Sequence, residues 1–313
     1  MICGRIRGVL TIMIYLILAI LFSTGVFVAM RLFERFHLDN HQALMWNYVV
    51  AAGTGFLMCK LSGEPFDTLP QLVSEPWFGL SIITGFWFIF TYLLMTASTQ
   101  RSGVTVTSLS SKLSVVLPTL AGVFLFEEVL DLSSVTGIMK VVGIAMALVA
   151  LVLVVGGKKN DMRSEANRNW FLPLLILFGT GTGDILMKYT EQLAKQQNEN
   201  ADLSFMIAFI YLIALLFGIL IVVYDLIRGK SKWQWKSALG GIGLGIINFF
   251  STFGVFHAMR YFDNVVLFPI YNIGVVSLTA LTGWLFFKEK LTWKNYLGLA
   301  IAIIAVILIT LKP

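Results

Sequence analysis

The segment "FEEVL" at residues 126–130 returns 161 positions later as "FKEKL" at residues 287–291, with its Phe, its central Glu and its Leu unchanged. The same shift, without a gap, superimposes further small residues: Ala97 on Ala258, Gly122 on Gly283 and Gly137 on Gly298. A register that holds over residues 77–137 indicates an internal repeat. The sequence therefore predicts that the chain is built from two similar halves.

The residues around these segments are too apolar for a water-soluble protein. Of the 313 residues, 58% are hydrophobic and 13% are charged, and the mean hydropathy is +0.84. Apolar runs of about 20 residues recur along the chain, which is the length that crosses a bilayer as a helix. We therefore expect an all-α integral membrane protein whose surroundings are lipid. The net charge of +6 then belongs to loops beside headgroups, and no nucleic-acid partner is expected.

Ten apolar stretches can be placed as transmembrane helices. Their ranges are 9–30, 43–60, 77–97, 103–126, 133–155, 170–189, 203–227, 236–259, 264–287 and 293–311. The first is interpreted as a span rather than a signal peptide, because its apolar run continues to Met30 with no small-residue cleavage site after it.

The polar stretch 156–169 divides these spans into two repeats of five, 1–157 and 158–313. Because five is odd, the second repeat must enter the membrane in the opposite direction. Inverted repeats of this kind are typical of secondary transporters, which bind their solute near the bilayer midplane between the repeats.

The spans, the repeat and the paired Phe-x-Glu-x-Leu segments resemble the EamA-type ten-helix transporters of the drug/metabolite transporter superfamily. Pro118 and Gly137 stand where that pattern usually has them, whereas Thr279 replaces a proline and Ile304 replaces a glycine in the second half. The resemblance implies export or exchange of metabolites such as amino acids across a bacterial inner membrane. It leaves a homodimer open and implies that both termini lie in the cytoplasm.

The basic residues indicate the opposite orientation. With alternating spans, about twice as many Lys and Arg lie on the side away from the termini as on the side of the termini. The positive-inside rule then places both termini outside the cytoplasm.

A reporter fused to the C-terminus separates these two orientations. From the charge distribution we expect activity of a reporter that works only outside the cytoplasm. Activity of a cytoplasmic reporter instead would contradict the charge argument and agree with the resemblance.

Three charged residues fall inside the predicted spans: Lys112, Lys140 and Asp184. A charge near the centre of a bilayer costs at least about 2.5 kcal/mol and normally faces protein or water. Each of the three is therefore a candidate functional residue, with a structural ion pair as the alternative.

Lys112 lies in "TSLSSKLSVVLP", residues 107–118, among hydroxyl side chains. Helical spacing places Ser108 and Ser111 on about one face of this span. Such a polar stripe indicates either a wet cavity or hydrogen bonds to a packed helix, and both alternatives stay open. In the first case Lys112 binds a carboxylate or phosphate on a solute, and the two serines orient it.

The repeat places Tyr271 and Asn272 at the positions equivalent to Ser110 and Ser111. Tyr271 offers an aromatic face and a hydroxyl, and Asn272 offers a donor and an acceptor. Asn248 follows a glycine-rich stretch, 240–245, that favours close helix packing. All three are candidates for solute binding, with ordinary packing as the alternative.

Asp184 is expected to lie at the depth of Lys140 and to form either a structural ion pair with it or a proton-coupling site. Lys112 is expected nearer the opposite side of the membrane. Glu128 and Glu289 lie at span ends and are interpreted as anchors of loops.

These residues favour a secondary transporter of a small polar or amphipathic organic solute, working by alternating access. A cavity lined from spans 1, 3, 4, 6, 8 and 9 is expected. A flippase for lipid headgroups or polyprenyl carriers is the alternative with the same fold. The intramembrane charges supply no nucleophile and base, and His257 stands without a Cys or carboxylate cluster, so we expect no enzyme, no cofactor and no metal site.

Overall fold

The structure is a computed structural model that describes residues 2–61, 69–117, 134–156, 171–197, 203–259 and 264–310. These residues form helices joined by short turns, and no strand occurs among them. In chain order the helices are α1 (Ile2–Arg35), α2 (Asn40–Leu61), α3 (Leu69–Ser74), α4 (Phe78–Ser102), α5 (Val104–Leu113), α7 (Val135–Gly156), α8 (Phe171–Gln197), α9 (Leu203–Ile227), α10 (Trp235–Met259), α11 (Asn264–Phe287) and α12 (Trp293–Thr310).

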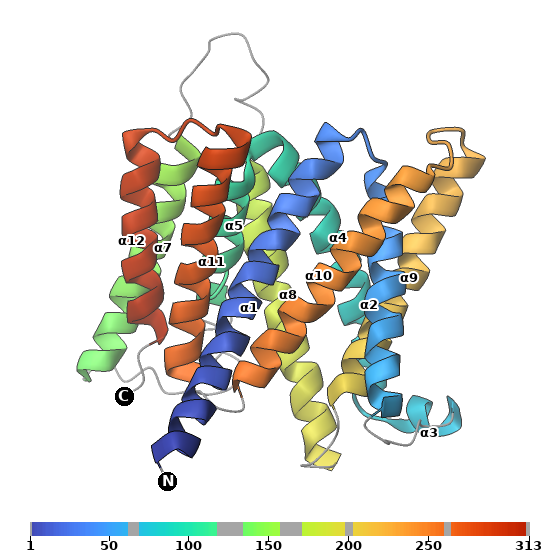
Figure 1. The fold of residues 1–313 in the computed structure, drawn as a ribbon, viewed down its shortest axis with the longest axis horizontal. Coiled ribbons are helices and arrows are strands. Elements are labelled where there is room, and N and C mark those ends of the chain that lie inside the picture. The colour runs from blue at the N-terminus through green and yellow to red at the C-terminus, as the bar shows by residue number, and fades with distance from the viewer. Residues whose placement is uncertain are drawn as a thin grey trace.

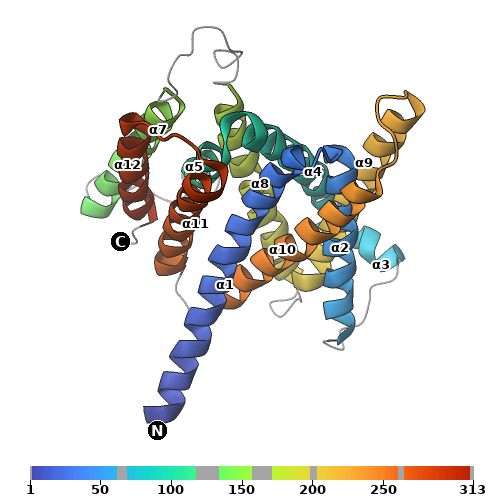
Figure 2. The ribbon, with the colours of Figure 1, turned by 45° about the horizontal axis from the view of Figure 1, so that its top comes forward.

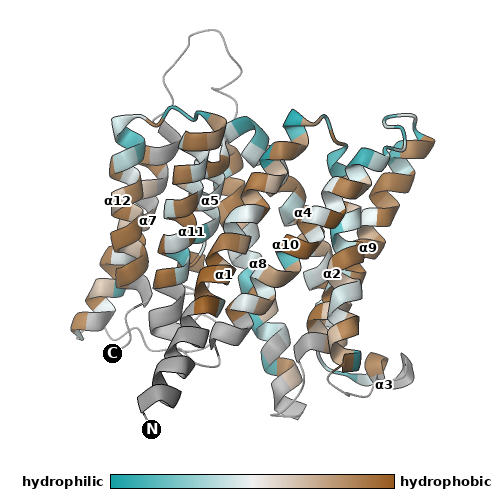
Figure 3. Ribbon diagram, in the orientation of Figure 1, coloured by the Kyte–Doolittle hydropathy of each residue, from teal (hydrophilic) through white to brown (hydrophobic). Residues whose placement is uncertain are grey.

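The long helices run alternately up and down (Figure 1). The start of α1 and the end of α12 lie at the same end of the molecule, which we call the terminal face. The turns at 36–39, at Gly103, at 228–234 and at 288–292 lie at the other end, which we call the opposite face. Apolar residues form the middle of the helices and polar residues gather towards the opposite face (Figure 3).

Six helical segments of the described residues are long and apolar enough to cross a membrane. They are Ile14–Arg35, Phe78–Ser102, Phe171–Ala194, Phe205–Ile227, Trp235–Val255 and Ile270–Phe287. Shorter apolar helices lie at Gly137–Ala147 and Trp293–Leu308. The protein is thus all-helical where it is described, with the composition of a membrane protein.

The helices of the first half pack mainly against helices of the second. α2 lies between α9 and α10, α1 packs on α10 and α11, α4 packs on α8 and α9, and α5 packs on α8 and α11. α7 and α12 pack together and form one flank, while α2, α3 and α9 form the other (Figure 2). The core therefore joins the two halves rather than filling each one separately.

Two glycines explain how closely α10 approaches α2. A side chain at Gly241 would collide with the carbonyl oxygen of Ala43, and a Cβ at Gly245 would lie 2.6 Å from the carbonyl oxygen of Asn47. Gly243, on another face of α10, has nothing within 4 Å of its Cβ position. Small residues let helix backbones meet, as the glycine-rich stretch predicts.

The fourth predicted span, 103–126, is not one continuous helix. α5 ends at Leu113, one residue after Lys112, and residues 114 and 115 form a turn. The hydroxyl of Ser114 donates to the carbonyl oxygen of Ser111 at 2.5 Å, a local bond that competes with helical hydrogen bonding. The remainder of this span, including Pro118, Gly122 and Glu128, lies outside the described residues.

The glycine contacts make a paired prediction about stability. Gly241→Ala should lower the free energy of unfolding by about 1–3 kcal/mol, because the backbone of α2 cannot yield to a methyl group. The midpoint of thermal unfolding of the purified protein measures this. Gly243→Ala is the matched control and should be neutral or stabilising by up to about 1 kcal/mol, since alanine is the better helix former. Equal midpoints for the two variants would contradict the packing explanation.

Candidate functional site

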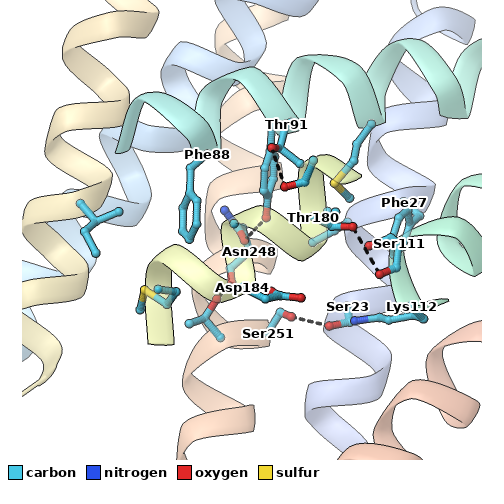
Figure 4. A pocket seen from close by; sticks show the side chains of 18 of the residues that line it. Ser23, Phe27, Phe88, Thr91, Ser111, Lys112, Thr180, Asp184, Asn248 and Ser251 are labelled. Carbon is cyan, nitrogen blue, oxygen red and sulfur yellow. Dashed lines mark hydrogen bonds between the residues drawn. The ribbon is translucent and has the colours of Figure 1, made fainter. Parts of the chain in front are cut away.

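A cavity of about 280 Å³ lies at mid-depth among seven helices (Figure 4). α1, α4, α5, α8, α10 and α11 line it, which are the six spans expected from the sequence, and α9 contributes as well. Of the predicted site residues, the structure brings five to this cavity: Ser111, Lys112, Asp184, Asn248 and Tyr271.

Lys112 lies in the last turn of α5, where the helix dipole is negative and favours a cation. Its Nζ lies 4.3 Å from the centre of the Tyr271 ring, a cation–π contact between the two halves of the chain. The Tyr271 hydroxyl is hydrogen-bonded to Ser23 of α1, and Ser23 Oγ lies 2.6 Å from Ser251 Oγ of α10. The ammonium group thus faces a polar wall built from three helices, α1, α10 and α11.

Asp184 presents a carboxylate to the same cavity from α8, and its side chain is exposed there. Ser114 Oγ donates to Asp184 Oδ2 at 3.4 Å. The charge of Lys112 acts on this carboxylate, but among the described ion pairs none joins the two residues. The cavity wall therefore contains one positive and one negative side chain that form no ion pair with each other among the described contacts.

Asn248 forms a second polar group in the cavity wall. Its Oδ1 accepts a hydrogen bond of 2.6 Å from the Tyr92 hydroxyl, and its Nδ2 donates to Asn47 Oδ1 at 3.2 Å. Beside it, the hydroxyls of Tyr211 and Thr252 lie 3.1 Å apart. These bonds hold the amide and both tyrosines in fixed orientations.

Apolar side chains complete the wall. They are Val26, Phe27, Phe88, Met95, Met187, Ile207 and Ile210. A site of this kind, in which apolar side chains alternate with hydroxyl and amide groups and two charged side chains, suits a small amphipathic organic molecule that carries a charged end.

Two predicted residues do not line this cavity. Ser108 is fully buried, and its Oγ lies 2.6 Å from Thr279 Oγ1 of α11. It therefore takes part in a contact between packed helices, which was the alternative to a wet cavity. Asn272 faces a separate recess of about 10 Å³ beside Leu109 and Val276. The reason is that α5 touches α11 along its upper turns and reaches the cavity only in its last turn.

The predicted pair of Asp184 with Lys140 is not seen among the described ion pairs, and Lys112 is the lysine that lies in the cavity wall with Asp184. No ion pair joins Lys140 to Asp184 among the described residues, and Lys140 does not line the cavity. α7 begins at Val135, so Lys140 lies less than two turns inside, on a half-exposed part of the helix flank. A lysine there extends its ammonium group towards the headgroups.

Several polar residues of the cavity wall were not predicted from the sequence. They are Ser23, Thr91, Tyr92, Thr180, Tyr211, Ser251 and Thr252. Each is uncharged and lies within an apolar run, so hydropathy alone does not single it out. Their one signal is a polar group near the middle of a span, which also occurs in ordinary helix contacts.

The second half of the chain is similar to a known family of transporters. Residues 181–311 match the model of the EamA-like transporter family, which confirms the resemblance over the second half of the chain. An uncharacterized protein of Haemophilus influenzae is 27% identical over 297 residues, covering 93% of this chain and 95% of the relative.

The fold also has a counterpart among solved structures. A crystal structure of a protein that is 12% identical superimposes with a TM-score of 0.59 and covers 95% of this chain and 96% of the other. At that identity the likeness shows the fold alone. The described helices thus include six with the length and composition of membrane spans, and residues 181–311 are similar to a family of transporters.

Proposed function

We propose that this chain, whose residues 181–311 match the EamA-like transporter family, is a secondary transporter that moves a small polar or amphipathic organic metabolite by alternating access. The observation that carries this proposal is the cavity at mid-depth with Lys112 and Asp184 in its wall. Two inverted five-helix repeats, 1–157 and 158–313, would form the moving parts on either side of it.

The pattern of helix contacts supports the inverted repeat. Exchanging the halves pairs α1 with α8, α2 with α9, α4 with α10, α5 with α11 and α7 with α12. Under this exchange the contact of α1 with α10 becomes that of α8 with α4, and the contact of α1 with α11 becomes that of α8 with α5. The contact of α2 with α10 likewise becomes that of α9 with α4, and all six contacts are present.

In this proposal Lys112 binds the anionic group of the solute. A carboxylate or phosphate in the cavity replaces the Tyr271 ring as the partner of the ammonium group. The attraction is strong because the apolar wall screens charges poorly. Ser111 and Tyr271 orient the solute, and Asn248, held by Tyr92 and Asn47, offers hydrogen bonds on the far wall.

Asp184 supplies the opposite charge. In the empty cavity it balances the charge of Lys112, which reduces the cost of holding an ammonium group at this depth. When an anion binds to the ammonium group of Lys112, the Asp184 carboxylate becomes available to bind a proton or a cationic group of the same solute. This gives Asp184 a role in coupling that does not require Lys140.

The size of the cavity favours a small solute over a lipid. Its volume of about 280 Å³ lies just below the range of about 300–1,000 Å³ that is usual for drug-sized ligands. A flippase would place only a headgroup here and would leave the acyl chains between the helices.

The test is solute flux into proteoliposomes. A panel of carboxylates and phosphates of metabolite size is assayed with the wild-type protein and with Lys112→Ala. We expect the variant to lose at least about tenfold in the initial rate for the transported solute, because the anionic group of the solute loses the ammonium group that binds it.

Lys140→Ala is the matched control, since it removes an intramembrane lysine that lies outside the cavity. It should transport at the wild-type rate. Equal flux through the wild-type protein and Lys112→Ala would remove Lys112 from the site. No flux of any solute above that of empty liposomes would contradict the transport function itself.

A further inference from the structure

A carboxylate from the second half of the chain caps a helix of the first half at the opposite face. Glu289, in the turn between α11 and α12, accepts hydrogen bonds from the backbone N–H groups of Val104 at 2.6 Å and Thr105 at 3.3 Å. The Thr105 hydroxyl donates to its Oε2 at 2.8 Å. These are the first residues of α5, where free N–H groups and the helix dipole favour a negative charge.

The backbone around Glu289 is built to hold this position. Gly103 has a φ of 93°, and a Cβ there would lie 2.5 Å from Glu289 Oε1. A Cβ on Gly283 would lie 2.6 Å from Glu289 Oε2 and 2.8 Å from Thr105 Oγ1. The N–H of Glu289 also donates to the carbonyl oxygen of Gly283 at 2.9 Å, which fixes the turn that aims the carboxylate at α5.

From this cap, contacts between α5 and α11 continue inward to the cavity. One turn below Thr105, Ser108 Oγ and Thr279 Oγ1 lie 2.6 Å apart. At the inner end, Lys112 lies over the Tyr271 ring. α5 and α11 are neighbours in both views of the ribbon (Figures 1 and 2). The row of contacts from Glu289 to Lys112, which we call the α5–α11 seam, therefore joins the two halves from the opposite face to the cavity.

We propose that Glu289 is a positioning residue that latches the α5–α11 seam and keeps the cavity closed towards the opposite face. This inference rests on the proposed alternating access, which requires the two halves to separate at one face at a time. Release of the carboxylate from the N-terminus of α5 lets the seam open. An anion that takes Lys112 away from Tyr271 removes the inner contact of the same seam, which connects occupancy of the cavity to opening.

The latch predicts a change in the distance between the two halves that needs no transported solute. Spin labels are placed at Arg101→Cys and Lys290→Cys, near the start of α5 and beside Glu289, in a protein that carries Cys3→Ser and Cys59→Ser. Distances between the labels are measured by pulsed electron double resonance in liposomes. Glu289→Gln should raise the population with a long distance about tenfold, because an amide group replaces the charge that caps α5.

Two further variants complete the design. Glu34→Gln is the matched control: it neutralises a carboxylate on the same face whose ion pair with Arg31 stays within α1. It should leave the distances unchanged. Gly283→Ala keeps Glu289 but fills the space that its carboxylate needs, so it should also raise the long-distance population. If both changes act through one contact, the double variant should raise the long-distance population by less than the product of the two single increases.

The outcomes separate the latch from the transport function. If Glu289→Gln and Gly283→Ala both show the distances of Glu34→Gln, the latch is wrong, whatever the flux. If one of the two variants does not fold, the other decides. If the distances shift as expected while no solute crosses the membrane, the latch stands as a contact between the halves and the transport proposal fails.

Discussion

The arrangement depends on an ammonium group held in a cavity among apolar helices. Lys112 is tolerated there because three groups offset its charge: the C-terminal end of α5, the face of Tyr271, and the carboxylate of Asp184 across the cavity. Among the described contacts, Lys112 forms no ion pair with Asp184. The ammonium group is therefore balanced but still available, which is the state that a binding site for an anion requires.

The same helix connects this charge to the surface. α5 is only 10 residues long, and both of its ends are held by the second half of the chain, by Glu289 at Val104 and by Tyr271 at Lys112. In the proposed latch, a short helix fixed at its two ends would move as one body. An event at the cavity would then reach the opposite face without bending a long helix, and Gly103 and Gly283 leave the space that the Glu289 carboxylate occupies.

The sequence predicts the class of the fold well and the site in part. Apolar runs depend on local composition, so the helices follow from them. The two similar halves rest on the 161-residue register and stay a prediction. The neighbours of Asp184 depend on lateral packing, whereas the choice of Lys140 from the sequence rests on depth alone. Ser108 and Ser111 lie on about one stripe, yet Ser108 meets α11 and Ser111 meets the cavity, because α5 crosses from one environment to the other along that stripe.

The most direct test of the account is thermal unfolding of the purified protein in the presence of small solutes. A ligand that binds only the folded state raises the midpoint, and at about 100 times its Kd it adds about 2.7 kcal/mol. We expect a carboxylate or phosphate solute to stabilise the wild-type protein and the Lys140→Ala variant, and to leave Lys112→Ala unchanged. Equal stabilisation of Lys112→Ala by that solute would show that the ammonium group does not form its binding site.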